Sequence, residues 1–421
     1  MKRLLRRVLL GGAVLAVAGL VGWWGYNRKA RSAFEEQLRL ARQEGMVTSA
    51  AEFRARIPNA TDTENAASIY RNLKGRLPTT IDFADLTKQV AYKAGRHDLN
   101  MARKFLQEYR PVLQDLDVAV ERPRCWFDRR WEDGAATLMP ELAQMKSAAR
   151  LILLRATVAV ADGNSKAAIQ DVERTRKLAK HAGEEPTMIA RLVEAGIHRM
   201  ALDALASWSF SNRNQPLYAQ LMIQTVQSLP NPNLKEENLG SLYEILSLID
   251  LCSTPEGRHQ LGLSEPDISP LEGPMSLLIN PWKAKALIVE AERDRWRALT
   301  KPDQNLEAEL DKATRKLYRG LLAFPTAANL HTMLGSGNDP VLDRQVAFST
   351  GMLRFKALAR ALSQPKIPKQ IDTRDLLSPL DGKPLHYEFN GKQVRIWVSG
   401  DDHEGEPVVL KVPPDSVLSK Q

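Results

Sequence analysis

The sequence predicts a mainly α-helical protein with a small antiparallel β-sheet at its C-terminus. From about residue 30 to 363, apolar residues recur at three- and four-residue spacing, and alternating β-branched residues are scarce. The pattern changes near the end of the chain, where residues 385–389 and 392–398 alternate on either side of Asn390-Gly391. Asn-Gly is the strongest two-residue hairpin signal, and Val408, Leu410 and Val412 supply a third strand.

The chain begins with an apolar segment that predicts a membrane anchor. Residues 8–27 carry no charge, and a helix of that length spans about 30 Å, which matches the hydrocarbon core of a bilayer. Trp23, Trp24 and Tyr26 cluster at its end, as interfacial aromatic residues do. We expect a transmembrane helix over residues 1–30, a cytoplasmic N-terminus and an extracytoplasmic remainder, which is periplasmic in a Gram-negative bacterium. Cleavage after Ala18 stays open, because Ala16-Val17-Ala18 fits a signal-peptidase site.

The charge of the chain is unevenly placed. The 421 residues carry a formal net charge of +9, with a pI near 9.4. Residues 1–31 hold seven basic side chains and no acidic one, so the other 390 residues are nearly neutral. A nucleic-acid binder needs a basic stripe on its folded domain, so this distribution argues against nucleic acid as a partner.

The helical part is predicted as a series of antiparallel helical hairpins. A first helix over residues 31–44 ends at Gly45, and the Thr61–Glu64 capping box opens another that runs through Leu73. A helix over residues 99–116 is kinked or split at Pro111. The strongest block, residues 140–208, forms three helices separated by short breaks, and its Gly163…Ala168-Ile169 turn is similar to that of a tetratricopeptide repeat. The expected domains are residues 1–30, an extracytoplasmic helical domain over residues 31–365 and a β appendix over residues 366–421.

One segment combines arginines with aromatic residues and is the candidate binding surface. It runs from Arg122 to Trp131, and we select Arg124, Trp126, Arg129, Arg130 and Trp131 within it. Stacked arginine and tryptophan side chains suit a protein partner or an anionic ligand. The alternative is that the aromatic rings cap the helical core while the arginines stay hydrated.

Two further features allow a calcium site and a disulfide. Asp401, Asp402 and Glu404 lie close together, so their carboxylates are candidate calcium ligands; the alternative is a hydrated loop between two strands. The only two cysteines, Cys125 and Cys252, exclude a disulfide framework but leave a single disulfide open.

Several short motifs stand out by their residue patterns. They are Glu64-Asn65-Ala66-Ala67-x-x-Tyr70, Trp131-Glu132-Asp133-Gly134, Glu185-Pro186 and the closing stretches 378–387 and 398–402. Together they resemble an uncharacterised family of bacterial membrane-anchored helical proteins, and this resemblance implies no activity. The C-terminal end is also similar to the strand and loop of type II secretion pseudopilins, whose loop binds calcium. The N-terminus lacks the pilin processing signature.

These observations predict a single-pass membrane protein that serves as a protein-interaction or assembly module in the cell envelope. No G-x-S-x-G, Walker A, dinucleotide-binding, H-E-x-x-H or C-x-x-C motif occurs, which favours a protein that is not an enzyme. Two alternatives stay open: an envelope enzyme with an unrecognised site, and a component of a secretion or pseudopilus system. The expected partners are the lipid bilayer, through residues 8–27, and another protein.

Overall fold

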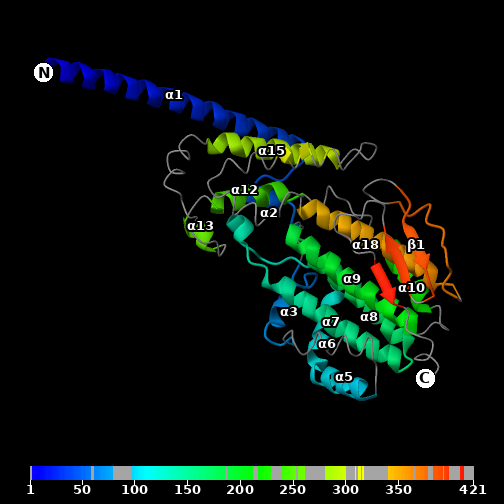
Figure 1. The fold of residues 1–421 in the computed structure, drawn as a ribbon. Coiled ribbons are helices and arrows are strands. Elements are labelled where there is room, and N and C mark those ends of the chain that lie inside the picture. The colour runs from blue at the N-terminus through cyan, green and yellow to red at the C-terminus, as the bar shows by residue number, and fades with distance from the viewer. Residues whose placement is uncertain are drawn as a thin grey trace. The chain divides into compact units, whose positions relative to one another are not determined.

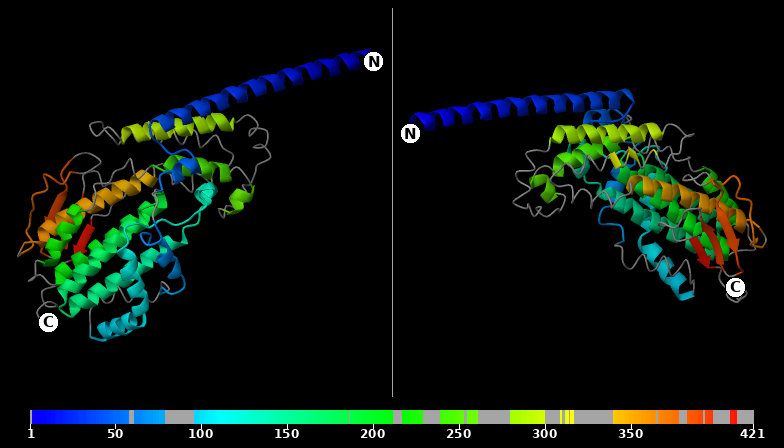
Figure 2. Two further views of the ribbon diagram at one scale, coloured as in Figure 1. Left: turned by 180° about the vertical axis from the view of Figure 1, so that it is seen from behind. Right: turned by 45° about the horizontal axis from the view of Figure 1, so that its top comes forward.

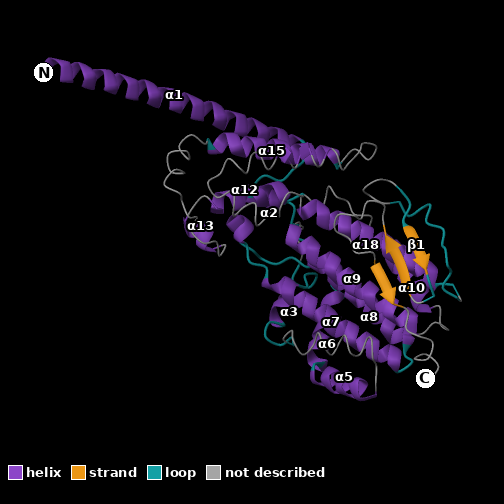
Figure 3. Cartoon of the chain, viewed as in Figure 1, coloured by secondary structure: helices purple, strands orange, loops and turns teal. Residues whose placement is uncertain are grey.

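The chain is mainly helical, and its strands lie near the C-terminus (Figure 3). The computed structural model describes residues 2–57, 61–78, 96–185, 187–211, 217–228, 239–252, 255–260, 280–299, 309, 312–313, 315–316, 340–364, 366–377, 383–391, 393–397 and 408–411. The predicted fold class, helices followed by a small antiparallel sheet, is confirmed at this level.

Contacts divide the chain into two compact units, each built from separate stretches of sequence. Unit 1 comprises residues 1–54, 131–136 and 239–340, and unit 2 comprises residues 55–130, 137–238 and 341–421. This division differs from the linear order of the predicted domains, whose boundaries at residues 30 and 365 stay a prediction.

Three helices form the centre of unit 2, as the block at residues 140–208 predicts. They are α7 (Pro140–Ala161), α8 (Ser165–Ala182) and α9 (Met188–Ser211), and they pack side by side (Figure 1). Gly163, with φ of 74°, ends α7 in a conformation that side-chain-bearing residues rarely adopt. Asn164 then caps α8, because its side-chain oxygen accepts a hydrogen bond from the Ala167 N–H.

The smaller helices of unit 2 lie around this centre. Helix α5 (Arg96–Glu108) ends just before α6 (Arg110–Val120), so Pro111 splits the predicted helix, and it occupies the first turn of α6. Helix α3 (Ala67–Asn72) begins later than its predicted capping box, because Thr61 and Glu64 bond to each other in a separate turn. Two further helices among the described residues of the unit are α10 (Leu217–Ser228) and α18 (Pro340–Leu362).

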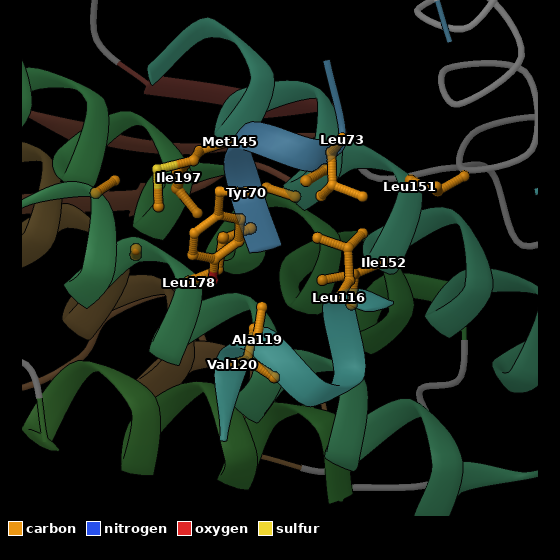
Figure 4. Packing of buried hydrophobic residues seen from close by; sticks show 14 of the residues in the cluster. Tyr70, Leu73, Leu116, Ala119, Val120, Met145, Leu151, Ile152, Leu178 and Ile197 are labelled. Atoms are coloured by element: carbon orange, nitrogen blue, oxygen red, sulfur yellow. The ribbon is translucent and has the colours of Figure 1, made fainter. Parts of the chain in front are cut away.

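The main core of unit 2 gathers side chains from α3, α6, α7, α8 and α9. Figure 4 shows Tyr70 of α3 among Met145, Leu178 and Ile197, and all four are almost completely buried. Burying each large apolar side chain contributes about 1.5–3 kcal/mol, so this core dominates the stability of the unit.

The C-terminal sheet has three antiparallel strands in the order β1 (His386–Phe389), β2 (Gln393–Trp397) and β3 (Val408–Lys411). The alternation predicts a pairing of Tyr387 with Val394, but Tyr387 pairs with Ile396, so the register is shifted by two residues. The turn is centred later because Asn390 pairs with Gln393, and Gly391 has φ of 88°. A shift of two keeps every side chain on its predicted face, and Val394 and Ile396 are fully buried.

Unit 1 is built around the longest helix of the chain, α1 (Lys2–Gln43). Helix α15 (Pro281–Ala298) lies alongside its C-terminal half, and α1 continues beyond the start of α15 (Figure 2). Phe34 and Ala41 of α1 are buried with Val289 and Trp296 of α15. Further described elements of the unit are α2 (Ala50–Arg54), the 3₁₀ helix η1 (Trp131–Ala136), α12 (Ser241–Cys252) and α13 (Pro255–Gln260).

The predicted membrane anchor over residues 8–27 is contradicted. Among the residues whose side chains the structure describes, no helix is both long and apolar enough to cross a membrane. The single-pass topology that depended on this anchor is contradicted with it.

Candidate functional site

The arginine-rich segment selected from the sequence is held by backbone and side-chain hydrogen bonds in unit 2. The Ala66 N–H donates to the Arg124 carbonyl at 2.8 Å, and the Arg124 N–H donates to the Glu64 carbonyl at 3.1 Å. The Asn65 side chain bonds both sides of the Trp126 backbone, accepting from its N–H at 2.9 Å and donating to its carbonyl at 2.8 Å. Two segments about sixty residues apart in sequence are thereby joined.

A buried ionic cluster lies at the end of this segment. Arg129 Nε donates to the Glu185 carboxylate at 2.9 Å, and its Nη1 donates to Glu141 at 3.0 Å. The side chains of Arg129 and Glu185 are only 4% and 3% exposed. The Phe127 ring lies 4.8 Å from the guanidinium carbon, so one face of the cation is covered by an aromatic ring.

The electrostatics of the cluster follow from this burial. Burial raises the pKa of Glu185, although the charge and hydrogen bonds of Arg129 oppose the rise. Arg129 also donates to the Leu138 carbonyl, but its Nη2 is buried without a hydrogen-bond partner. Two carboxylates thus share one buried cation, and removing that cation would leave both without their main charge partner.

A tyrosine–histidine pair lies between α3 and α8. Tyr70 Oη is 2.9 Å from His181 Nδ1, and His181 Nε2 is 2.9 Å from the Arg122 carbonyl. A carbonyl can only accept, so Nε2 carries the proton and Nδ1 accepts from the tyrosine hydroxyl. Burial lowers the pKa of His181 and raises the pKa of Tyr70, which keeps both groups neutral near pH 7.

Glu184 completes the contacts between the segment and the end of α8. Its carboxylate accepts from the Cys125 N–H at 2.6 Å and from Arg124 Nη1 at 3.1 Å. Cys125 is a free, buried thiol, so the proposed disulfide with Cys252 does not form here. Burial raises the pKa of this thiol, which makes it a poor nucleophile.

A second ionic cluster links α6, α7 and α8. Arg155 donates to Asp117 and to Asp171, with N···O distances of 2.6–3.0 Å, and Arg174 contacts the same two acids. Burial lowers the pKa of Arg155, but the two aspartates more than reverse that effect and raise it. Its groups pair with one another across three helices, as expected of a structural network.

The five residues selected as a binding surface differ in their surroundings. Arg124 and Arg130 are exposed, whereas Trp126 and Arg129 are buried in the contacts described above. Trp131 belongs to unit 1, where its buried ring lies 4.6 Å from that of Phe53. The structure therefore supports the alternative in which the aromatic rings pack inside, and a binding role for the two exposed arginines stays a prediction.

The predicted calcium ligands Asp401, Asp402 and Glu404 lie outside the described residues. Within the part of the chain that the structure describes, no group of three or more His, Cys, Asp or Glu side chains could hold a metal ion.

Sequence reasoning selected the arginine-rich segment but missed the residues that hold it, namely Asn65, Tyr70, His181, Glu184 and Glu185. A signal was present, because Asn65, Tyr70 and Glu185 belong to motifs that carried the family resemblance. These separate motifs meet at one place in unit 2.

Another surface suits binding better than this closed cluster. In the middle of α1 the large apolar side chains are all exposed, namely Val17, Leu20, Val21, Trp23, Trp24 and Tyr26. A Cβ atom built on Gly19, Gly22 or Gly25 would meet nothing within 4 Å, so within the described part of the chain nothing packs against the helix at these three positions. We call residues 17–26 the exposed apolar stretch. Monomeric soluble proteins seldom expose so many large apolar side chains together, and such patches mark interaction sites.

Comparisons with known proteins identify no relative: no protein-family model, curated protein or solved structure matches the chain significantly. The resemblance to membrane-anchored helical proteins stays a prediction.

Proposed function

We propose that this chain is a protein-interaction module, in which unit 2 is a rigid helical scaffold and α1 supplies a binding element. The observation that carries the proposal is the exposed apolar stretch, whose six large apolar side chains are 47–65% exposed. Removing such surface from water contributes roughly 25 cal/mol per Å², so a partner that covers it gains substantial binding free energy.

The groups with catalytic potential support a binding function over an enzymatic one. Tyr70, His181 and Glu185 are buried: Tyr70 bonds to His181, and Glu185 accepts from Arg129. Burial also raises the pKa of the Cys125 thiol. A catalytic acid, base or nucleophile must reach its substrate, whereas these groups join α3 and α8 to the arginine-rich segment. We further propose that the α7–α8 hairpin is similar to a tetratricopeptide repeat unit, with Gly163 at its turn.

The test compares partners of the wild-type chain with those of the double variant Trp23→Ala, Trp24→Ala. Both full-length proteins carry an affinity tag and are crosslinked in the source cells, and recovered proteins are quantified by mass spectrometry. We expect at least one reproducible partner of the wild type, with recovery at least tenfold lower for the double variant. Identical recovery from both proteins would overturn the proposed function.

A matched control distinguishes a loss of binding from a loss of folding. Arg39→Ala changes a residue on the same helix whose side chain is exposed and forms an ion pair with the exposed Glu36. It should leave both helix content, measured by circular dichroism, and partner recovery unchanged.

A further inference from the structure

Helices α1 and α15 pair along a heptad seam within unit 1. Ala30, Phe34 and Ala41 of α1 are buried. Asn27 of α1 bonds to the N-cap residue of α15, and Gln37 of α1 and Glu44, the residue that follows α1, accept hydrogen bonds from Arg293 of α15. In sequence order these six positions are separated by alternating steps of three and four residues. That alternation is the a and d repeat of a coiled coil, in which successive positions face the same partner helix.

Hydrogen bonds between the two segments give the direction and the register of the pair. Asn280 Nδ2 donates to Asn27 Oδ1 at 2.7 Å, and Trp296 Nε1 donates to the Glu44 carbonyl at 3.0 Å. Residue numbers rise together on both helices, so α1 and α15 run parallel. The Asn280 side chain is buried and that of Asn27 is half-buried, and a polar asparagine at an a position is a recognised device for fixing coiled-coil register.

The asparagine pair also marks the position on α1 at which its contact with α15 ends. Asn280 is the N-cap of α15, and its Oδ1 accepts from the backbone N–H groups of Trp282 and Lys283. On α1 the same three- and four-residue steps continue past Asn27 to Trp23 and then to Leu20. These two side chains are 59% and 65% exposed, so the seam continues here without a helix of the described residues against it.

We propose that a helix of a partner protein docks on this bare part of the seam, contacting Leu20 and Trp23 and continuing the line of α15. The inference rests on the proposed function and names its partner: an apolar heptad helix, parallel to α1, with acidic side chains in its last turn. Continuity with the α1–α15 interface fixes the occupant as a helix.

Charge fixes the direction of that helix. The start of α15 presents the positive end of a helix dipole, and the exposed Arg28 and Lys29 lie in the adjoining turn of α1. A parallel occupant brings its C-terminal, negative end to this place, whereas an antiparallel one brings a second positive end. Acidic side chains in the occupant's last turn add to the attraction.

The same charge disfavours a second copy of this chain as the occupant. Residues 1–31 hold seven basic and no acidic side chains. Two copies paired through this region would bring these cationic segments together, which opposes association. An acidic partner helix has no such penalty.

The experiment uses the full-length chain and a fluorescent three-heptad peptide with leucine at its a and d positions and glutamate in its last turn. Binding is measured by fluorescence anisotropy, and a second peptide carries lysine in place of the glutamates. We expect the acidic peptide to bind at least tenfold more tightly, with an advantage that shrinks as salt rises. Equal affinities, or no binding by either peptide, would overturn the proposal.

Adjacent tryptophans supply the matched variants. Trp23 lies on the seam and Trp24 lies about 100° around the helix from it, yet their exposed fractions, 59% and 60%, are almost equal. Trp23→Ala should weaken peptide binding roughly thirtyfold, as loss of a central tryptophan typically does, and Trp24→Ala should weaken it less than threefold. Equal losses would overturn the seam while leaving the proposed interaction function intact.

Two further measurements identify the other possible occupants of the seam, a second copy of the chain and a lipid surface. Sedimentation velocity that shows a dimer of the wild type, lost in Trp23→Ala, would overturn the partner helix in favour of a second copy. Binding to vesicles of phosphatidylcholine and phosphatidylglycerol that both tryptophan variants weaken alike would overturn it in favour of a lipid surface.

Discussion

Replacing Arg129 by methionine should destabilise unit 2 more than any exposed charge substitution in the same segment. Arg129→Met keeps the apolar stem but removes the hydrogen bonds to Glu185, Glu141 and the Leu138 carbonyl. The side chains of the two acids are 3% and 11% exposed, so water cannot replace the lost cation. Breaking a buried ion pair from one side costs about 3–5 kcal/mol.

The assay is urea unfolding of the full-length chain, followed by circular dichroism. With an m-value of about 3 kcal/mol/M, a loss of about 4 kcal/mol lowers the unfolding midpoint by more than 1 M. The control is Arg124→Met, which removes the exposed partner of Glu184 and should cost less than about 1 kcal/mol. Midpoints that fall equally in the two variants would refute the assignment of Arg129 as a buried structural cation.

Three further predictions concern the stability of the helical scaffold. Burial and the nearby Arg176 charge lower the pKa of His198 from 6.5 to about 4, so the unfolded chain binds its proton first and stability falls as pH drops through this window. The resulting loss in the free energy of unfolding reaches about 3 kcal/mol. His198→Leu should make the urea midpoint nearly independent of pH between pH 7 and 4.5. The control, His259→Leu at an exposed position, should leave the pH dependence of the midpoint as it is in the wild type. Gly163→Ala should lower the thermal midpoint, at a cost of about 1 kcal/mol for the left-handed backbone, while Gly196→Ala inside α9 should raise it; a fall in both would contradict this explanation. Tyr70→Phe should cost about 1–3 kcal/mol in the same melt because a buried histidine nitrogen loses its donor, and an unchanged midpoint would disprove that bond.

Local signals predicted most of the helices and strands correctly. The breaks at Asp162-Gly163-Asn164 and Pro111 occur where predicted, because a left-handed glycine and a proline act within one turn of the chain. The sheet has its predicted faces but a register shifted by two, since alternation fixes which side a residue faces and not which neighbour it meets.

Long-range contacts were the part that sequence patterns could not give. The segment around Arg129 looked like an exposed binding surface because arginines and tryptophans are common at interfaces. Its burial depends on Asn65 and Glu185, which lie about sixty residues away on either side and carry no local sign of contact. The burial of the α1 seam depends on a contact of the same kind, because Asn280, the N-cap of its partner helix α15, lies 253 residues after Asn27.

The N-terminal helix shows how one pattern supports two interpretations. Apolar residues over 8–27 predicted a bilayer span, whereas the described side chains beyond Asn27 pack against another helix of the same chain. The three- and four-residue steps run through the apolar stretch and through the part of α1 that follows it. They could not be recognised in the apolar stretch, because nearly every residue there is apolar and no single face stands out.

Photocrosslinking in the source cells tests the central claim most directly. A benzophenone amino acid replaces Trp23 in one full-length protein and Trp24 in another, and crosslinked peptides are identified after irradiation. We predict that position 23 crosslinks to an apolar segment with acidic residues at its end in another protein, at least tenfold more than position 24. Equal crosslinking from both positions, or products formed only with lipid or with a second copy of the chain, would contradict a one-sided seam for a partner helix.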